Sequence, residues 1–509
     1  MKVVATGWVL LALSSAVSAE LRSPFHERGL LDLILPKPLV SSTLLQLTIS
    51  SKNLLKHAKS LAKFASDNGG NRAFGSKGHN ATVNYIKKLL DDTKYYDTEL
   101  QTFPYLFTEG TSKFSANGTG YATSWFTYGP AGDVTAPIVA VNNLGCELSD
   151  FPAAVSGNIA LIKRGTCAFG IKIAQAGAAG AAGAIIYNND VGPVGSGTLG
   201  AISQPQGPYV PMGGLSGTDG TALLAALSTG VEIIGKLHVD ATTETRWTSN
   251  VLATSKFGNK TNVIMAGGHT DSVTAGPGIN DDTSGSMALL EVALQLKHFK
   301  TKNAIRFAFW TAEEFGLVGS AHYAASLSLE EQNKIALYLN FDMIASPNAG
   351  YFVFDGDGNA FNMSGPAGSE HIEKVFNDYF KSHKLVSAPA AFTGRSDYGS
   401  FLPLGIPAGG LFTGHEAVKN QTQFEWWGGQ VGEVFDKCYH KACDTIDNLN
   451  VPFWERNTKA IAHAIAAYGL STSGIPRDPR GAPKELSRVS TLSYDDRKHQ
   501  ACGETIPTI

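Results

Sequence analysis

The sequence predicts an α/β fold in which a mixed, mostly parallel β-sheet is covered by helices on both faces and interrupted by an inserted β-rich domain. From residue 250 onwards, near-continuous apolar strands such as NVIMAGGH and AIRFAFW alternate with amphipathic helices such as MALLEVALQLKHF. This alternation is typical of a parallel sheet that is buried on both faces. Between Phe103 and Leu237 the chain is instead rich in Gly, Ala, Val, Thr and Pro, with short strand-like runs and few charges.

The first 19 residues have the pattern of a secretory signal peptide. Lys2 gives a basic start, WVLLAL is a short apolar middle, and Val17-Ser18-Ala19 fits a cleavage site of small residues. The apolar run is too short to span a bilayer, and no later segment has the roughly 18 consecutive apolar residues of a membrane helix. We therefore expect an exported protein without a membrane span.

The remaining chain divides into four segments. Residues 20–38 are interpreted as a pro-segment, residues 39–102 and 238–474 as the main α/β domain, residues 103–237 as the insert, and residues 475–509 as a polar tail. Within the main domain, the apolar periodicity of Leu44–Ala65 predicts one helix. Within the insert, the Ala- and Gly-rich Lys172–Asn188 predicts a helix packed closely on a buried strand.

Composition and charge restrict the partners of this chain. It has 509 residues, of which 43% are apolar, which suits two or three globular domains. The net charge of −3, with both signs mixed, gives no reason to expect nucleic acid or an anionic membrane as a partner. We expect a monomer. Five sequons, which are acceptor sites for N-glycosylation in exported proteins, agree with export: they begin at Asn80, Asn117, Asn259, Asn362 and Asn420.

The five cysteines allow two disulfides in an oxidising compartment. Cys438 and Cys443 can close a small loop, and Cys146 and Cys167 form the natural second pair because both lie in the insert. Cys502 is then left unpaired in the polar tail.

One stretch, GGHTDSVTAGPGINDDTSGS (Gly267–Ser286), contains a histidine and three aspartates but no lysine or arginine. It is open to three interpretations: a solvated turn, a calcium loop, or part of a transition-metal site. The spacing of an EF-hand loop is absent. Histidine mixed with carboxylates suits zinc better than calcium, which normally takes oxygen ligands.

Other polar residues follow the neighbouring predicted strands. Glu313-Glu314 comes after AIRFAFW, and Asp342 comes after ALYLNF. The carboxyl ends of strands in an open α/β sheet line a common crevice, so we expect these residues to meet His269 and the aspartates of the glycine-rich stretch. Of the adjacent glutamates, one can bind metal while the other acts as a general base.

A second histidine is expected to complete the site. His415 fails the H-E-x-x-H pattern because Lys419 stands where the second histidine would be. His440, in CYHKAC, lies between two cysteines whose disulfide would fix its ring. A serine nucleophile is disfavoured because GRSDYG lacks the second glycine of the G-x-S-x-G motif.

With these residues assembled, the chain resembles the co-catalytic zinc aminopeptidases of peptidase family M28. The motifs HTDSVTAGPGINDDTSGS, WTAEEFGLVGS, YLNFDMIAS, GRSDYGSF and FDKCYHKACDTIDN occur in the order and spacing of that family, across most of Leu44–Leu470. The stretch GNIALIKRGTCAFGIKIAQAGAAGAAGAIIYNND is similar to the protease-associated (PA) domain. The resemblance implies a zinc-peptidase-like α/β domain with a PA domain inserted in it.

The resemblance also implies a ligand set for two zinc ions. It assigns His269 and Asp342 to one ion and Glu314 and His440 to the other, with Asp281 as the bridge between them.

Further roles are implied for the residues around the metals. Glu313 is expected to be the general acid/base and Asp271 the carboxylate that orients His269. Tyr439 is expected to help polarise the scissile carbonyl, and Arg395 to lie near the substrate amine.

The expected activity is hydrolysis of the N-terminal bond of peptides that have a free N-terminus, releasing mainly hydrophobic, leucine-type residues. The enzyme is expected to be extracellular, with the vacuolar lumen as an alternative destination. Two rival functions are a non-catalytic PA-domain binding or sorting protein and a carboxypeptidase of the same family. The complete set of ligands favours the aminopeptidase.

Overall fold

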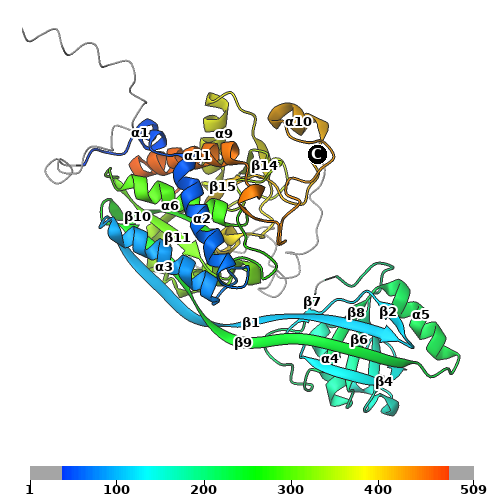
Figure 1. Ribbon diagram of the computed structural model, residues 1–509. Coiled ribbons are helices and arrows are strands. Elements are labelled where there is room, and N and C mark those ends of the chain that lie inside the picture. Colours follow the sequence, from blue (N-terminus) through cyan, green and yellow to red (C-terminus); the bar gives the residue numbers. More distant parts are fainter. Residues whose placement is uncertain (1–36, 196, 481–509) are drawn as a thin grey trace, which may run out of the picture.

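The computed structural model describes residues 37–195 and 197–480, which form a larger and a smaller part joined by a long two-stranded ribbon (Figure 1). The predicted signal peptide, residues 20–36 of the predicted pro-segment, and Cys502 lie outside the described residues. In the described residues, no helix has both the length and the apolar character needed to cross a membrane.

The larger part is built on a mixed sheet with the strand order β14-β13-β15-β12-β10-β11-β9-β1. Strands β10, β11, β12 and β15 are parallel neighbours, which confirms the mostly parallel sheet predicted from the alternating pattern. The strand bounds are β1 Tyr96–Ala116, β9 Ile234–Ser255, β10 Asn259–His269, β11 Asn303–Trp310, β12 Ile335–Phe341, β13 Phe352–Phe354, β14 Ala388–Ala390 and β15 Ala408–Phe412.

Helices cover both faces of this sheet, because alternate residues of its strands point to opposite sides. In β11, Phe307 and Phe309 pack into the core on one face, whereas Ala308 and Trp310 pack into the core on the other. The first face is covered by α1 Ser42–Leu47, α2 Ser51–Ser66, α3 Lys77–Asp92, α6 Thr283–Leu296, α9 Ser369–Ser382 and α11 Val451–Leu470. The second is covered by α7 Val318–Ser326 and the short 3-10 helices η5 Asp397–Ser400 and η6 Leu402–Leu404. The larger part also contains α8 Leu329–Lys334, α10 Gln421–Trp427, η4 Glu313–Phe315 and η7 Ile446–Asn448.

The single helix predicted over Leu44–Ala65 is wrong, because the chain forms two helices there, α1 and α2. Ser50 has extended backbone angles, and its side chain accepts a hydrogen bond from the amide of Asn53. A serine in this position caps and starts a new helix. The apolar periodicity continues across the break and therefore concealed it.

The ribbon consists of β1 and β9, which pair antiparallel from Tyr96 opposite Ser255 to Ala116 opposite Gly235. Strand β9 also pairs with β11 at one end and with β4 of the smaller part at the other. The predicted boundaries at residues 103 and 237 fall inside these two strands, and the division into 39–102, 103–237 and 238–474 stays a prediction.

The insert beyond the ribbon has its own sheet and its own core. Four parallel neighbours, β4, β5, β6 and β8, carry an apolar cluster on each face. The bounds are β4 Gly132–Ala140, β5 Ile159–Lys163, β6 Gly183–Tyr187, β8 Met212–Leu215, α4 Phe169–Ala178 and α5 Gly217–Ser228, with the small elements β2 Thr119–Tyr121, β3 Phe126–Thr127, β7 Gly197–Thr198, η2 Leu148–Asp150 and η3 Ala153–Val155. The helix and buried strand predicted within Lys172–Asn188 are confirmed as α4 and β6.

Both predicted disulfides are present. Cys146 and Cys167 are joined in the insert with Cα atoms 5.9 Å apart, and Cys438 and Cys443 close the small loop in the larger part with Cα atoms 5.3 Å apart. The asparagines of all five sequons are exposed, which is compatible with glycosylation. Glycosylation itself stays a prediction.

Candidate active site

The site lies where the central parallel strands end. His269 is the last residue of β10 and is paired in register with Trp310, the last residue of β11. Glu313 and Glu314 follow β11 in η4, and Asp342 directly follows β12. Parallel strands with aligned ends bring these side chains to one edge of the sheet, as the sequence predicts.

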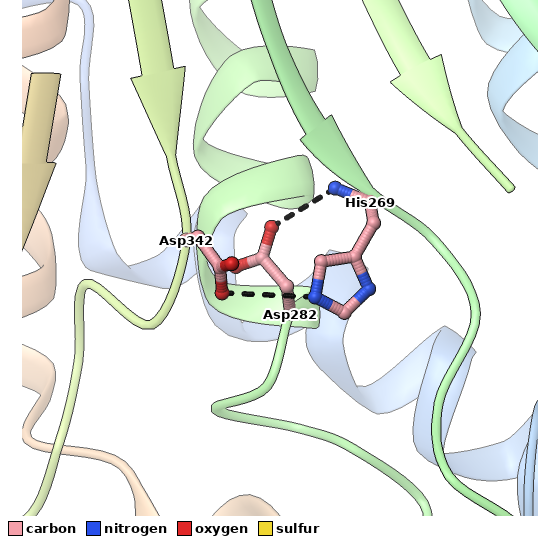
Figure 2. A group of neighbouring side chains, drawn as sticks. All are labelled: His269, Asp282 and Asp342. Carbon is pink, nitrogen blue, oxygen red and sulfur yellow. Dashed lines mark hydrogen bonds and ion pairs between the residues drawn. The ribbon is translucent and has the colours of Figure 1, made fainter. Parts of the chain in front are cut away.

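His269 faces three carboxylates. Its Nε2 atom lies 3.0 Å from Asp281 Oδ1, 3.6 Å from Asp342 Oδ1 and 3.9 Å from Glu313 Oε2. Figure 2 shows the His269 ring turned toward Asp342, with Asp282 beside them. These groups come from three separate stretches of the chain, so the fold has to bring them together.

Asp282 belongs to the backbone framework of this site. Its carboxylate accepts hydrogen bonds from the amides of His269 at 3.2 Å, Gly285 at 2.8 Å and Met343 at 3.1 Å. One aspartate therefore joins the end of β10, the first turn of α6 and the segment after β12. The peptide bond between Asp281 and Asp282 is cis.

His440 faces the opposite side of Asp281. Its Nε2 atom lies 3.2 Å from Asp281 Oδ2 and 3.0 Å from Glu314 Oε2. The two oxygens of Asp281 thus point at two different histidines. The disulfide loop that carries His440 packs closely on the 270–283 loop, since a Cβ atom added at Gly276 would lie 2.3 Å from the carbonyl oxygen of Lys441.

These residues fit a pair of zinc ions. Ligand atoms around a tetrahedral zinc ion, each about 2.0–2.2 Å from the metal, lie about 3.4 Å from one another. The distances from His269 to Asp281 and Asp342, and from His440 to Asp281 and Glu314, span 3.0–3.6 Å. Mixed imidazole and carboxylate donors are also the set that zinc prefers.

The electrostatics of the cluster call for positive charge. Burial on its own lowers the pKa of His440, but the carboxylates of Glu314 and Asp281 outweigh burial and raise it to about 11. Burial also opposes the charged form of His269, and the carboxylates of Glu313 and Asp342 raise its pKa well above the usual value. A divalent cation bound among these groups would balance the negative charge of the carboxylates in the same way as protonated histidines do.

Glu313 lies beside His269, with its Oε2 atom 3.9 Å from His269 Nε2, and is almost completely buried. Burial raises the pKa of its carboxyl group well above the usual value, and Asp342 and Asp397 add to this effect while His269 opposes it. The preceding residue, Ala312, has a φ of +53°, a left-handed conformation that a non-glycine residue adopts at some cost. This turn of the backbone directs the adjacent glutamates into the site.

Asp271 lies between His269 and Glu313. Its Oδ1 atom accepts a hydrogen bond of 3.1 Å from the Glu313 amide and is 3.6 Å from His269 Nδ1. His269 Nδ1 and Asp271 Oδ2 are both buried and have no hydrogen-bond partner among the described residues. The approach of the Asp271 carboxylate to within 3.6 Å of this ring nitrogen suits the expected orienting role.

Tyr439 and Arg395 lie next to each other at the edge of the cluster. Arg395 Nη2 donates to the Tyr439 hydroxyl at 3.3 Å and is also 3.3 Å from Glu416 Oε2. The Tyr439 ring stacks on His440, with centroids 3.8 Å apart, and on His415, with centroids 5.0 Å apart. Burial raises the pKa of Tyr439 well above the usual value, so its phenol stays protonated.

Sequence reasoning missed two charged residues that support the site. Asp444 accepts hydrogen bonds from the amides of Asn280 at 2.8 Å and Asp281 at 3.1 Å. Arg72 reaches the same loop from the other end of the chain and is fully buried. The position of Asp444 next to Cys443 was a usable signal, whereas Arg72 stands in GGNRAFG without any motif.

Comparison with known proteins identifies the family. Residues 250–465 match the model of peptidase family M28, and residues 134–223 match that of the PA domain. The chain is 47% identical over 453 residues to the probable leucine aminopeptidase 2 of Aspergillus fumigatus, an alignment that covers 89% of this chain and 90% of the relative. It is 43% identical over 490 residues to leucine aminopeptidase 2 of Arthroderma otae, which covers 96% of each chain.

Solved structures of aminopeptidases are also similar to this chain. The aminopeptidase from Aneurinibacillus sp. strain AM-1 has a TM-score of 0.64 and 30% identity, over 84% of this chain and 95% of that one. A zinc aminopeptidase from Bacillus subtilis, at 23% identity and a TM-score of 0.58 over 85% of this chain and 98% of that one, shares the fold.

The chain therefore belongs to peptidase family M28 and carries a PA domain as its insert. Within that family it is similar, over nearly its whole length, to the fungal proteins named leucine aminopeptidase 2. The family resemblance stated from the motifs is confirmed.

Proposed function

We propose that this chain is a zinc-dependent aminopeptidase that hydrolyses the first bond of peptides with a free N-terminus and releases mainly leucine-type residues. The observation that carries the proposal is the position of Asp281, whose two oxygens lie 3.0 and 3.2 Å from the Nε2 atoms of His269 and His440. A carboxylate in this position could be shared by two metal ions, one held on the side of each histidine. The names of the fungal relatives support the aminopeptidase activity.

The donor set divides into two halves. His269 and Asp342 would hold one zinc ion, Glu314 and His440 would hold the other, and Asp281 would be shared. When bound, zinc supplies Lewis acidity, which makes water more acidic and polarises a carbonyl group.

Glu313 is the proposed general acid/base. Its carboxylate takes a proton from the attacking water and then delivers that proton to the leaving amine. The raised pKa of its buried carboxyl group suits both steps, because the group can hold the proton between them. Asp271 fixes the backbone of Glu313 and lies beside the ring of His269, so it orients both.

Tyr439 is the proposed hydrogen-bond donor to the substrate carbonyl. Its phenol remains protonated, and its ring is held in place by stacking between His415 and His440. A donor aimed at the carbonyl oxygen stabilises the negative charge that develops there. Arg395 positions the hydroxyl through the contact at 3.3 Å, and the carboxylates of the cluster attract the free α-amine of the substrate.

We also propose that the enzyme is secreted, with the vacuolar lumen as the alternative destination. The signal-like first 19 residues, the two disulfides and the five exposed sequon asparagines support this proposal. Disulfides are typical of proteins that work in oxidising compartments.

The test combines metal analysis with substrate choice. The purified protein should contain two zinc ions per chain, lose activity on chelation and regain it when zinc is added back. It should cleave a leucyl peptide but leave the N-acetylated form of the same peptide intact. Release of the C-terminal residue would point to a carboxypeptidase, and protein without zinc or peptidase activity would favour a binding protein. Full activity with no more than one tightly bound ion would contradict the proposed pair.

A further inference from the structure

Arg72 is a buried cation that the proposed mechanism does not use. It lies in the loop between α2 and α3, far in sequence from the other residues of the site and outside the segment 250–465 that matches the family model. Its exposed fraction is 0%. A fully buried arginine needs hydrogen-bond partners and compensating charge, and its partners reveal its role.

Within the described residues, all four hydrogen bonds of the Arg72 side chain end on the loop of residues 270–283. Nε donates to the carbonyl oxygen of Pro277 at 3.0 Å, and Nη2 donates to the carbonyl oxygen of Gly278 at 2.6 Å and to Thr283 Oγ1 at 2.8 Å. Nη1 donates to the carbonyl oxygen of Thr270. The guanidinium group therefore ties together the beginning and the end of one loop.

The backbone of Arg72 adds to this attachment. Its amide donates to Ser272 Oγ at 2.9 Å, and its carbonyl oxygen accepts from the Ser272 amide at 3.3 Å. The loop is closed tightly around these contacts: Gly278 has a φ of +62°, and a Cβ atom there would lie 2.3 Å from the carbonyl oxygen of Asp281. The contacts leave this glycine-rich loop little freedom to move.

The charge of Arg72 also matches its surroundings. Burial lowers its pKa to about 10, while the carboxylates of Asp271, Asp444, Asp282 and Asp281 favour the charged form. The side chain is therefore cationic at neutral pH. The positive charge of Arg72 lies against the backbone of the 270–283 loop, and it reduces the mutual repulsion of these four carboxylates.

We propose that Arg72 is a positioning residue for zinc binding, which fixes the 270–283 loop so that His269 and Asp281 face the metals before the metals bind. This inference rests on the proposed function, because it assumes the zinc pair. Lysine cannot replace the fork of donors that arginine directs at several carbonyl groups. The half-site of His269 and Asp342 should depend most on Arg72, since both His269 and Asp281 are anchored by this loop.

The experiment compares Arg72→Met and Arg72→Lys with the control Arg306→Met. Arg306 is a partly buried arginine in β11 whose guanidinium group donates to Thr254 Oγ1 at 2.9 Å and to the Tyr323 hydroxyl at 2.6 Å. Zinc affinity is measured by competition with a chelator. Folding is checked by circular dichroism and melting temperature, and kcat and KM are measured at low and at saturating zinc. Arg72→Met should weaken the binding of at least one zinc ion ten-fold or more, with Arg72→Lys intermediate. Arg306→Met should keep the wild-type zinc affinity, even if its melting temperature falls as much as that of Arg72→Met.

Saturating zinc should restore kcat in Arg72→Lys with little change in KM, which general destabilisation would not produce. A folded Arg72→Met or Arg72→Lys protein that binds both ions with wild-type affinity overturns the inference. If Arg72→Met does not fold, Arg72→Lys decides the question by the same measurement. Wild-type protein that binds no zinc would refute the proposed function instead, so the two failures are distinct.

Discussion

Parallel strands of the larger part and of the PA domain end in loops with different chemistry. His269 ends β10, the Glu313-Glu314 pair follows β11 and Asp342 follows β12, and these residues lie together at the edge of the sheet. After β6, the amide group of Asn188 accepts from Arg164 at 3.1 Å and donates to the carbonyl oxygen of Pro193 at 2.9 Å.

Parallel strands thus bring polar residues together in both parts of the molecule. Only the cluster in the larger part has an excess of carboxylates that calls for a bound cation. In the PA domain, the polar side chain at the end of β6 is satisfied by a guanidinium group and a backbone carbonyl oxygen. Among the described residues of this domain, no His, Cys, Asp or Glu group has the spacing of a metal site. The difference teaches that the sheet decides where loop residues meet, whereas the residue types decide whether the meeting point can bind metal.

The largest expected effect comes from the adjacent glutamates. Glu313→Gln should keep both zinc ions but lower kcat by about 10²–10⁴-fold, because an amide cannot accept the proton of water. Glu314→Gln should instead lose metal from one half-site. Asp150→Asn is the matched carboxylate change in the PA domain, where Asp150 accepts from the amides of Cys146 and Glu147.

Zinc content by elemental analysis and kcat on a leucyl amide check these three variants. Asp150→Asn should leave both quantities unchanged. Equal loss of zinc from Glu313→Gln and Glu314→Gln would show that the roles of the pair are wrongly assigned.

The larger part and the PA domain each contain one disulfide, so the effects of removing each can be compared directly. Replacing Cys438 and Cys443 by serine should weaken zinc binding and lower kcat about ten-fold, because it frees the loop that carries His440. Replacing Cys146 and Cys167 should leave kcat unchanged. The loss of folding stability should follow the opposite order, because a disulfide that closes a longer loop removes more entropy from the unfolded chain. The free energy of unfolding should fall by about 2 kcal/mol without Cys438–Cys443, whose sequence separation is 5, and by about 3 kcal/mol without Cys146–Cys167, whose separation is 21.

Chemical denaturation, zinc titration and kcat measured on both double variants test this crossover. A fall in kcat of the same size in both would mean that the loop around His440 holds its shape without the disulfide.

Removal of the PA domain should have only a small effect on the chemistry, because we propose that this domain restricts access to the site without supplying catalytic groups. Gly110 and Ala241 are opposite each other in the ribbon, so an Asn-Gly turn can replace residues 111–240 and close a hairpin. Hydrolysis of a small leucyl amide should survive within a few-fold, whereas the dependence of kcat/KM on peptide length should change. Loss of zinc from a well-folded shortened protein would contradict this proposal.

The sequence was sufficient for those parts of the site that follow from strand ends and local motifs. His269, Glu313, Glu314 and Asp342 were predicted to meet because parallel strands share an edge, and His440 was singled out by its flanking cysteines. These residues do converge in the structure, while their roles stay proposals.

Other features depend on contacts that no local pattern records. Arg72 acquires its partners only when the loop after α2 folds against a loop some 200 positions further along the chain. The break between α1 and α2 was hidden because Ser50 interrupts the backbone without interrupting the apolar face. A single sequence shows which residues are compatible with a face or a motif, but not which distant loops come into contact.

The ribbon of β1 and β9 makes the PA domain an exchangeable module. The chain leaves the catalytic sheet and returns to it along neighbouring antiparallel strands, so at each step of the ribbon the two crossing points are one strand spacing apart. An evolutionary gain, loss or replacement of the module therefore needs no rearrangement of the host, only another way to connect two strands that are already paired. Accessory domains can be recombined at this junction while the metal-binding edge of the sheet is inherited intact.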